Sequence, residues 1–111
     1  MEISDSQVQG IRVVQIAGDI DGSTAPEAQA HILSLLQPNG TLILDMTGVG
    51  YMSSAGLRML LSTYRTVTGN GGRVILVGLS EDIQDTMSAT GFLNFFVLQD
   101  TLDGALGVLN A

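Results

Sequence analysis

One stretch decides how this chain folds: Asp45-Met46-Thr47-Gly48-Val49-Gly50-Tyr51-Met52-Ser53-Ser54-Ala55-Gly56-Leu57-Arg58. A run of strand formers, residues 41–44, leads into it. Apolar side chains then recur at the i, i+3, i+4 and i+7 spacing of a helix, at Leu57, Leu60, Leu61 and Tyr64. The stretch is therefore predicted to contain the end of a strand, a short glycine-containing loop and the start of a helix with one buried face.

Two serines, Ser53 and Ser54, fall where this helix is expected to begin. The first backbone N–H groups of a helix lack intrahelical partners, and the helix dipole favours negative charge there. Either hydroxyl can therefore cap the helix, as most serines at helix starts do, and either can carry a phosphate. A loop between the carboxyl end of a strand and a helix is also where open α/β sheets place their sites. The local chemistry leaves both interpretations open.

The longer pattern resembles the signature of the STAS family, the sulfate-transporter and anti-sigma-factor-antagonist domain. The resemblance lies in an apolar strand that ends in Asp45, the Tyr51-Met52 pair, the two serines and the Gly56-Leu57 pair. Upstream, Gly18-Asp19-Ile20-Asp21 followed by Ala25-Pro26 is similar to the Gly-x-Leu-Asp segment before that family's first helix. The resemblance covers essentially the whole chain, residues 1–111, as a single STAS domain.

In the anti-anti-sigma members of that family, the serine two residues before Gly-Leu accepts a phosphate from an anti-sigma factor that is itself a serine kinase. The resemblance implies Ser54 as the phosphoacceptor, with Ser53 as the alternative, and a serine phosphatase as a further partner. The chain differs from the best-known members at two neighbours, with Ser53 where Asp is frequent and Ala55 where Ser is frequent. We predict that Ser53 caps the helix and that small side chains let a partner approach. The predicted partner-binding residues are Asp19, Asp21, Ser53, Ser54, Ala55 and Gly56.

The rest of the chain alternates between strand and helix signals after an N-terminal hairpin of residues 2–9 and 11–17. Helices are expected to begin near residues 23, 53, 80 and 100, the last capped by Asp100, and further strands at 41–46, 73–78 and 94–98. This order, which the STAS resemblance also implies, predicts an α/β domain with a mixed, mostly parallel sheet of about five strands and about four helices.

Composition limits the classes of partner. The 11 acidic residues outnumber 4 basic ones, giving a net charge of −7, so a surface that binds the nucleic acid backbone is not expected. No apolar run approaches the roughly 20 residues that span a bilayer, so no membrane partner is expected. There is no cysteine, which excludes a disulfide framework and is compatible with a soluble, cytoplasmic protein.

The preferred hypothesis is a phosphorylation-switched protein-interaction module of the anti-sigma factor antagonist type. The alternative is a STAS domain that binds a ligand or serves as a scaffold, without a sigma-factor role. An enzyme is least favoured, because the only histidine, His31, is expected on a solvated helix face and has no second histidine or nearby catalytic serine. We therefore predict no catalytic residue, no metal and no cofactor.

Overall fold

The computed structural model describes residues 1–109 and contains a single five-stranded sheet with the order β1-β2-β3-β4-β5. The first two strands pair antiparallel as a hairpin, and every other neighbouring pair is parallel. The fold class expected from the sequence is thus confirmed. The strands are β1 (Glu2–Val8), β2 (Ile11–Ala17), β3 (Thr41–Gly48), β4 (Arg73–Val77) and β5 (Val97–Gln99).

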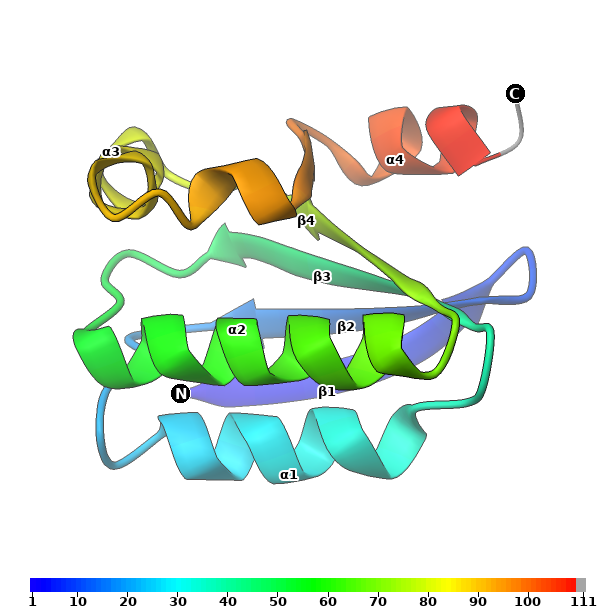
Figure 1. Cartoon of the computed structure of the whole chain (residues 1–111), viewed down its shortest axis with the longest axis horizontal. Helices are drawn as coiled ribbons and strands as arrows, with labels where there is room; N and C mark the ends of the chain where they lie inside the picture. The colour runs from blue at the N-terminus through cyan, green and yellow to red at the C-terminus, as the bar shows by residue number, and fades with distance from the viewer. Residues whose placement is uncertain (110–111) are drawn as a thin grey trace.

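Helices connect the parallel strands and cover both faces of the sheet (Figure 1). The first two helices, residues 25–35 and 54–69, lie side by side on one face, and the last helix, residues 102–109, lies on the other. Pro26 lies in the first turn of the first helix, where its fixed φ and missing N–H are tolerated. The helices are α1 (Ala25–Leu35), α2 (Ser54–Gly69), α3 (Glu81–Ala89) and α4 (Leu102–Leu109), with a short 3-10 helix η1 (Leu93–Phe95) before β5.

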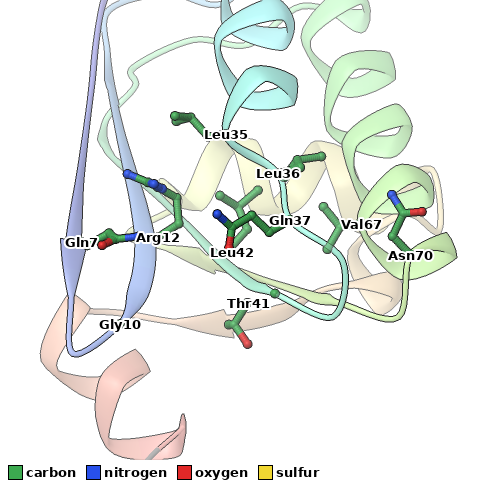
Figure 2. Close-up of a pocket in the computed structure, with 11 residues that line it drawn as sticks. Gln7, Gly10, Arg12, Leu35, Leu36, Gln37, Thr41, Leu42, Val67 and Asn70 are labelled. Atoms are coloured by element: carbon green, nitrogen blue, oxygen red, sulfur yellow. The ribbon is translucent and has the colours of Figure 1, made fainter.

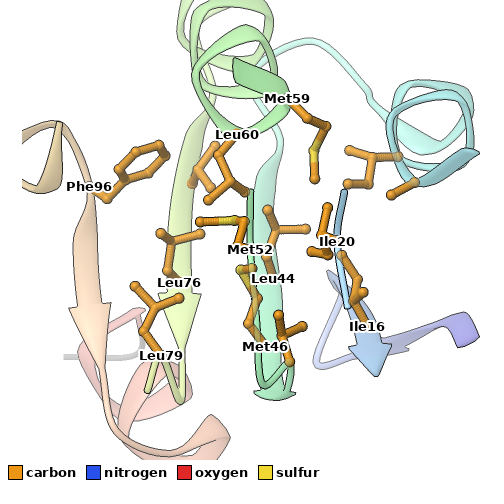
Figure 3. Packing of buried hydrophobic residues seen from close by; sticks show 14 of the residues in the cluster. Ile16, Ile20, Leu44, Met46, Met52, Met59, Leu60, Leu76, Leu79 and Phe96 are labelled. Carbon is orange, nitrogen blue, oxygen red and sulfur yellow. The ribbon is translucent and has the colours of Figure 1, made fainter. Parts of the chain in front are cut away.

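The main core lies between the sheet and helices α1, α2 and α3. Alternate residues of β3, such as Leu44 and Met46, point into it and belong to the same cluster as Leu60 of α2 (Figure 3). Two residues from loops, Ile20 and Met52, belong to the same core although neither is in a strand of the sheet. The loops that hold the candidate site are therefore anchored by apolar burial.

A second, smaller core lies on the opposite face, under α4. The other alternate residues of the central strands, Val13, Ile43 and Ile75, contact Ala105 and Leu106 there. The central strands are apolar on both faces, as parallel strands covered on both sides require.

The segment around β5 differs from the prediction. Residues 94–98 were expected to form one strand, but Asn94 and Phe95 belong to η1, and the strand begins only at Val97. Backbone N–H groups of Phe95 and Phe96 donate to carbonyls three residues earlier, and both rings pack on Tyr64 of α2, with centroids 5.7 and 5.4 Å apart. The apolar pattern of residues 94–98 predicts that their side chains pack in the protein. It does not predict the 3-10 turn that lets the rings of Phe95 and Phe96 both contact Tyr64.

His31 is partly solvated, and it makes a surface contact that the sequence did not predict. Its Nε2 lies 3.0 Å from Oδ1 of Asp5 on β1, and the other carboxylate oxygen of Asp5 accepts from Arg12 at 3.1 Å. All three side chains are about a quarter to a third exposed, so the cluster is a partly solvated surface contact that ties α1 to the hairpin. Such contacts contribute little net stability.

The N-cap residue of α4 is Thr101, which differs from the prediction of Asp100. The Thr101 hydroxyl oxygen, and not Asp100, accepts a hydrogen bond from the N–H of Gly104 at 3.0 Å. Thr101→Ala is therefore expected to lower the free energy of unfolding by about 1 kcal/mol, measured by urea denaturation. Asp100→Ala should change it by less than about 0.5 kcal/mol, and a larger loss for Asp100→Ala than for Thr101→Ala would contradict this assignment.

Candidate functional site

The candidate site lies at the carboxyl edge of the parallel strands, where two loops run side by side (Figure 1). Ile20, between β2 and α1, pairs with Met52, between β3 and α2, in a parallel bridge. The Ile20 N–H donates to the Tyr51 carbonyl at 3.0 Å, and the Ser53 N–H donates to the Ile20 carbonyl at 2.8 Å. The structure therefore brings the segment containing Asp19 and Asp21 beside the two serines.

Ser53 occupies the N-cap position of α2 but does not cap the helix with its side chain. Its backbone is extended, with φ −80° and ψ 177°, and its carbonyl accepts from the Leu57 N–H at 3.0 Å. Its hydroxyl oxygen is buried and has no hydrogen-bond partner among the described residues. The predicted capping hydrogen bond is thus wrong, because the hydroxyl points inward and away from the exposed helix end.

Ser54 is the first residue of α2 and is exposed. The backbone N–H groups of the first helical turn have no intrahelical acceptor. Ser54 therefore presents its hydroxyl to solvent at the positive end of a 16-residue helix. Ser54 is thus accessible to solvent, whereas the Ser53 hydroxyl oxygen is enclosed.

Gly56, predicted as a partner contact, has a packing role inside the protein. It is buried, and a Cβ at this position would overlap Met52 Cγ and lie 3.1 Å from Ile20 Cγ2 and 3.2 Å from the Ile20 carbonyl oxygen. The missing side chain lets the chain's own β2–α1 loop approach α2. Ala55 is half-buried and lines a shallow groove between α1 and α2.

Asp21 has a structural role that the sequence interpretation missed. Its Oδ1 accepts from the Ser23 hydroxyl at 2.8 Å and from the backbone N–H groups of Ser23 and Thr24 at 2.9 and 3.1 Å. These hydrogen bonds, led by the Ser23 hydroxyl, lower the pKa of Asp21 below its ordinary value. Asp21 thus holds the turn before α1 in its ionised form, while the neighbouring Asp19 is exposed.

Asp45 lies on the other side of the sheet from α2. It alternates with Leu44 and Met46, which face α2, and it lines a hollow with residues of β1 and β2. Its Oδ1 accepts from the N–H and hydroxyl of Thr47 at 3.1 and 2.6 Å. Asp45 therefore does not share a surface with Asp19 and Asp21, which lie beside the serine loop.

Negative charge stands at the start of every α-helix except the one that begins with Ser54. The first turns contain Glu27 in α1, Glu81 and Asp82 in α3, and Asp103 in α4, but α2 has no acid in its first turn. A negative group at a helix start is stabilised by the dipole. A phosphate on Ser54 would supply to α2 the charge that the other helices already have.

The sequence interpretation passed over two residues near Ser54. The Tyr51 side chain is 55% exposed, although tyrosine usually buries most of its ring, and exposed aromatics are typical anchors of protein interfaces. Arg58 is exposed one helical turn after Ser54. The positions of both are readable from the sequence, but their exposure is decided by which face of the loop and helix packs on Ile20.

A partly enclosed pocket lies far from this site, at the opposite edge of the sheet. It holds about 60 Å³ between the β1–β2 hairpin and the ends of α1 and α2, with Arg12, Leu36 and Val67 among its walls (Figure 2). A buried water needs on the order of 10–15 Å³, so this volume suits a few waters better than a cofactor. Within residues 1–109, no group of three or more acidic or histidine side chains is placed to hold a metal ion. None of the described helices is long and apolar enough to cross a membrane.

These features define a small α/β domain whose candidate site is an exposed serine at a helix start, and not a pocket. The chain belongs to the STAS domain family, whose family model matches residues 2–105. Over 84% of its length it is 29% identical to the anti-sigma-B factor antagonist of Bacillus subtilis, of which it covers 85%.

Solved structures agree with this assignment. The crystal structure of an anti-sigma factor antagonist from Mycobacterium paratuberculosis superposes with a TM-score of 0.87 at 27% identity, covering 99% of this chain and 94% of that one. The Bacillus cell fate determinant SpoIIAA in its phosphorylated form has the same fold, with a TM-score of 0.75 at 18% identity and coverage of 97% and 99%.

The buried hydroxyl of Ser53 leads to a second prediction. Because it makes no capping bond, Ser53→Ala should leave the free energy of unfolding unchanged or raise it by up to about 1 kcal/mol. Ser80→Ala is the matched control, since the Ser80 hydroxyl does accept from the Ile83 N–H at 3.2 Å, and should cost about 1 kcal/mol. Equal losses for the two variants in urea denaturation would show that Ser53 caps α2 after all.

Gly56 gives a third prediction. Gly56→Ala should destabilise the protein by about 1–3 kcal/mol, because the added methyl group meets Ile20 and Met52. Alanine is otherwise favoured over glycine in helices by up to about 1 kcal/mol. Gly107→Ala in α4, where a Cβ would meet nothing within 4 Å, is therefore expected to be neutral or stabilising. Thermal unfolding of both variants tests this prediction. A lower unfolding temperature for Gly56→Ala alone indicates close packing at Gly56, whereas equal or higher temperatures for both variants indicate that helix propensity dominates.

Proposed function

We propose that this protein is an anti-sigma factor antagonist that binds an anti-sigma factor serine kinase when unphosphorylated and is released by phosphorylation of Ser54. The homologues reported above are themselves anti-sigma factor antagonists. The observation that carries the choice of residue is the contrast between the two serines. Ser54 is exposed at the start of α2, whereas the hydroxyl oxygen of Ser53 is buried.

In the proposed step the protein is the substrate and the partner is the enzyme. The Ser54 Oγ attacks the terminal phosphorus of a nucleoside triphosphate held by the kinase, so that a new O–P bond forms as the bond to the leaving nucleoside diphosphate breaks. The hydroxyl proton passes to a base of the kinase. A serine phosphatase would hydrolyse the same O–P bond with water and return the unphosphorylated form.

The effect of the phosphate is expected in binding and not in the fold. Phosphorylation adds about −1.5 to −2 charges to a chain that already has a net charge of −7. The helix start can accommodate this charge without unfolding, because α2 has no other acid in its first turn. A partner surface that fits the neutral hydroxyl closely would have to bury the phosphate dianion. The desolvation free energy of the dianion then exceeds the electrostatic gain unless the partner places a positive charge beside it.

The competing function, a STAS domain that binds a ligand or serves as a scaffold, finds less support. The pocket of about 60 Å³ lies at the other edge of the sheet from Ser54, and the groove beside α2 is shallow and open. The exposed Tyr51 and Ser54 support a protein-binding surface at this edge more than a ligand-binding pocket.

The test begins with a kinase captured from the source cells on the immobilised, unphosphorylated protein and then purified. With ATP and Mg²⁺ it should phosphorylate the wild type and the matched control Ser53→Ala to the same extent, and Ser54→Ala not at all. Site-resolved fragmentation should find the phosphate on Ser54. Phosphorylation of Ser54→Ala to the wild-type extent would overturn the assignment.

Calorimetric titration then measures the switch. Phosphorylation should weaken binding to the same kinase at least about tenfold, equivalent to about 1.4 kcal/mol. Ser54→Asp should weaken it less, because it carries one charge and not nearly two. If the genuinely phosphorylated protein binds as tightly as the unmodified one, the domain is a scaffold and not a switch.

A further inference from the structure

We propose that Arg58 binds the phosphate group of phosphorylated Ser54, so that the modified residue and its counter-ion lie on the same helix. Arg58 follows Ser54 by four residues in α2, and both are exposed. Four residues advance about 6 Å along a helix and about 40° around it. Side chains at this spacing are neighbours, with the acidic group on the N-terminal side, the more favourable order.

Arg58 is not engaged elsewhere. In the part of the chain that the structure describes, the ion pairs join Asp5 to Arg12 and to His31, and none involves Arg58. Arg58 stands at the groove between α1 and α2, whose other walls are neutral, including Gly22, Pro26 and Gln29. Gln29 is itself satisfied, since its side-chain N–H donates to the Ser62 hydroxyl at 2.9 Å. The guanidinium therefore needs to break no contact to reach a phosphate.

The other arginines are too far away to take this role. Arg12 and Arg73 begin strands at the opposite edge of the sheet, where they pair in register with Leu42 and Thr41. Arg65 lies on the same helix but about 16 Å further along its axis than Ser54. Beyond about 8–10 Å, charges at the surface are largely screened by salt. The neighbours on the β2–α1 loop, Asp19 and Asp21, repel a phosphate, so Arg58 is the arginine that can offset its charge.

The pairing has a consequence for the proposed switch. A guanidinium binds phosphate with two parallel charge-assisted hydrogen bonds, and an arginine that holds the phosphate in cis competes with basic groups of a partner. Arg58 would thus favour the dianionic state of the phosphate. It would also make the phosphate less available for ion pairs with the partner. This inference rests on the proposed function only for the identity of the modified serine.

The experiment separates the two proposals by avoiding the kinase. Phosphoserine is installed at position 54 during protein synthesis, in the wild type, in Arg58→Gln and in the matched control Arg65→Gln, which removes an exposed arginine of the same helix. Phosphorus NMR during a pH titration gives the second pKa of the phosphate in each protein. Arg58→Gln should raise that pKa by about 0.5 unit relative to the wild type, and Arg65→Gln should leave it within about 0.1 unit.

Thermal unfolding supplies a second readout that a merely structural role of Arg58 would not move. Phosphoserine should raise the unfolding temperature more in the wild type and in Arg65→Gln than in Arg58→Gln, relative to each protein with serine at position 54. Equal pKa values and equal increments for the two arginine variants would overturn the inference. A failure of the kinase to modify Ser54 would instead overturn the proposed function and leave the NMR result standing.

Discussion

The contact on which the rest of this site depends is the parallel bridge between the β2–α1 loop and the β3–α2 loop. Two backbone hydrogen bonds, from Ile20 to Tyr51 and from Ser53 to Ile20, extend the pairing of β2 and β3 beyond the sheet. Hydrogen bonds are stronger where water is excluded, and the buried side chains of Ile20 and Met52 exclude water beside this bridge. The start of α2 is thus placed by the core and not by its own cap.

This arrangement explains why two adjacent serines differ so much. The Ser53 backbone donates to the neighbouring loop and accepts from Leu57, which leaves its side chain directed inward. Ser54 follows on the outer side of the first turn. Gly56 completes the constraint, because only a residue without a side chain leaves room for Ile20 against α2. One local packing requirement therefore decides which hydroxyl is available for chemistry.

The charge distribution follows from the same topology. Parallel strands place all helix starts at one edge of the sheet, and three of the four α-helices have acids there. These acids stabilise their own helices through the dipole, and together they make the edge around Ser54 negative. Stability and function are linked at this edge, since the helix without a first-turn acid is the one that begins with the exposed serine. A negative edge of this kind favours partners with basic surfaces.

The sequence by itself determined the order of the elements, the N-terminal hairpin and the position of Ser54 at a helix start, because apolar periodicity and helix-start signals act over a few residues. The STAS resemblance, through the position before Gly56-Leu57, implied Ser54 as the phosphoacceptor, whereas the local chemistry left both serines open. Only the tertiary structure decided that Ser53 is enclosed, that Gly56 faces Ile20, and that Asp21 fastens a turn. The same holds for the 3-10 turn of Phe95 and the cap at Thr101. Each of these features depends on a contact with another segment or on the exact path of the backbone. The spacing of apolar residues along the sequence specifies neither the contact nor the path.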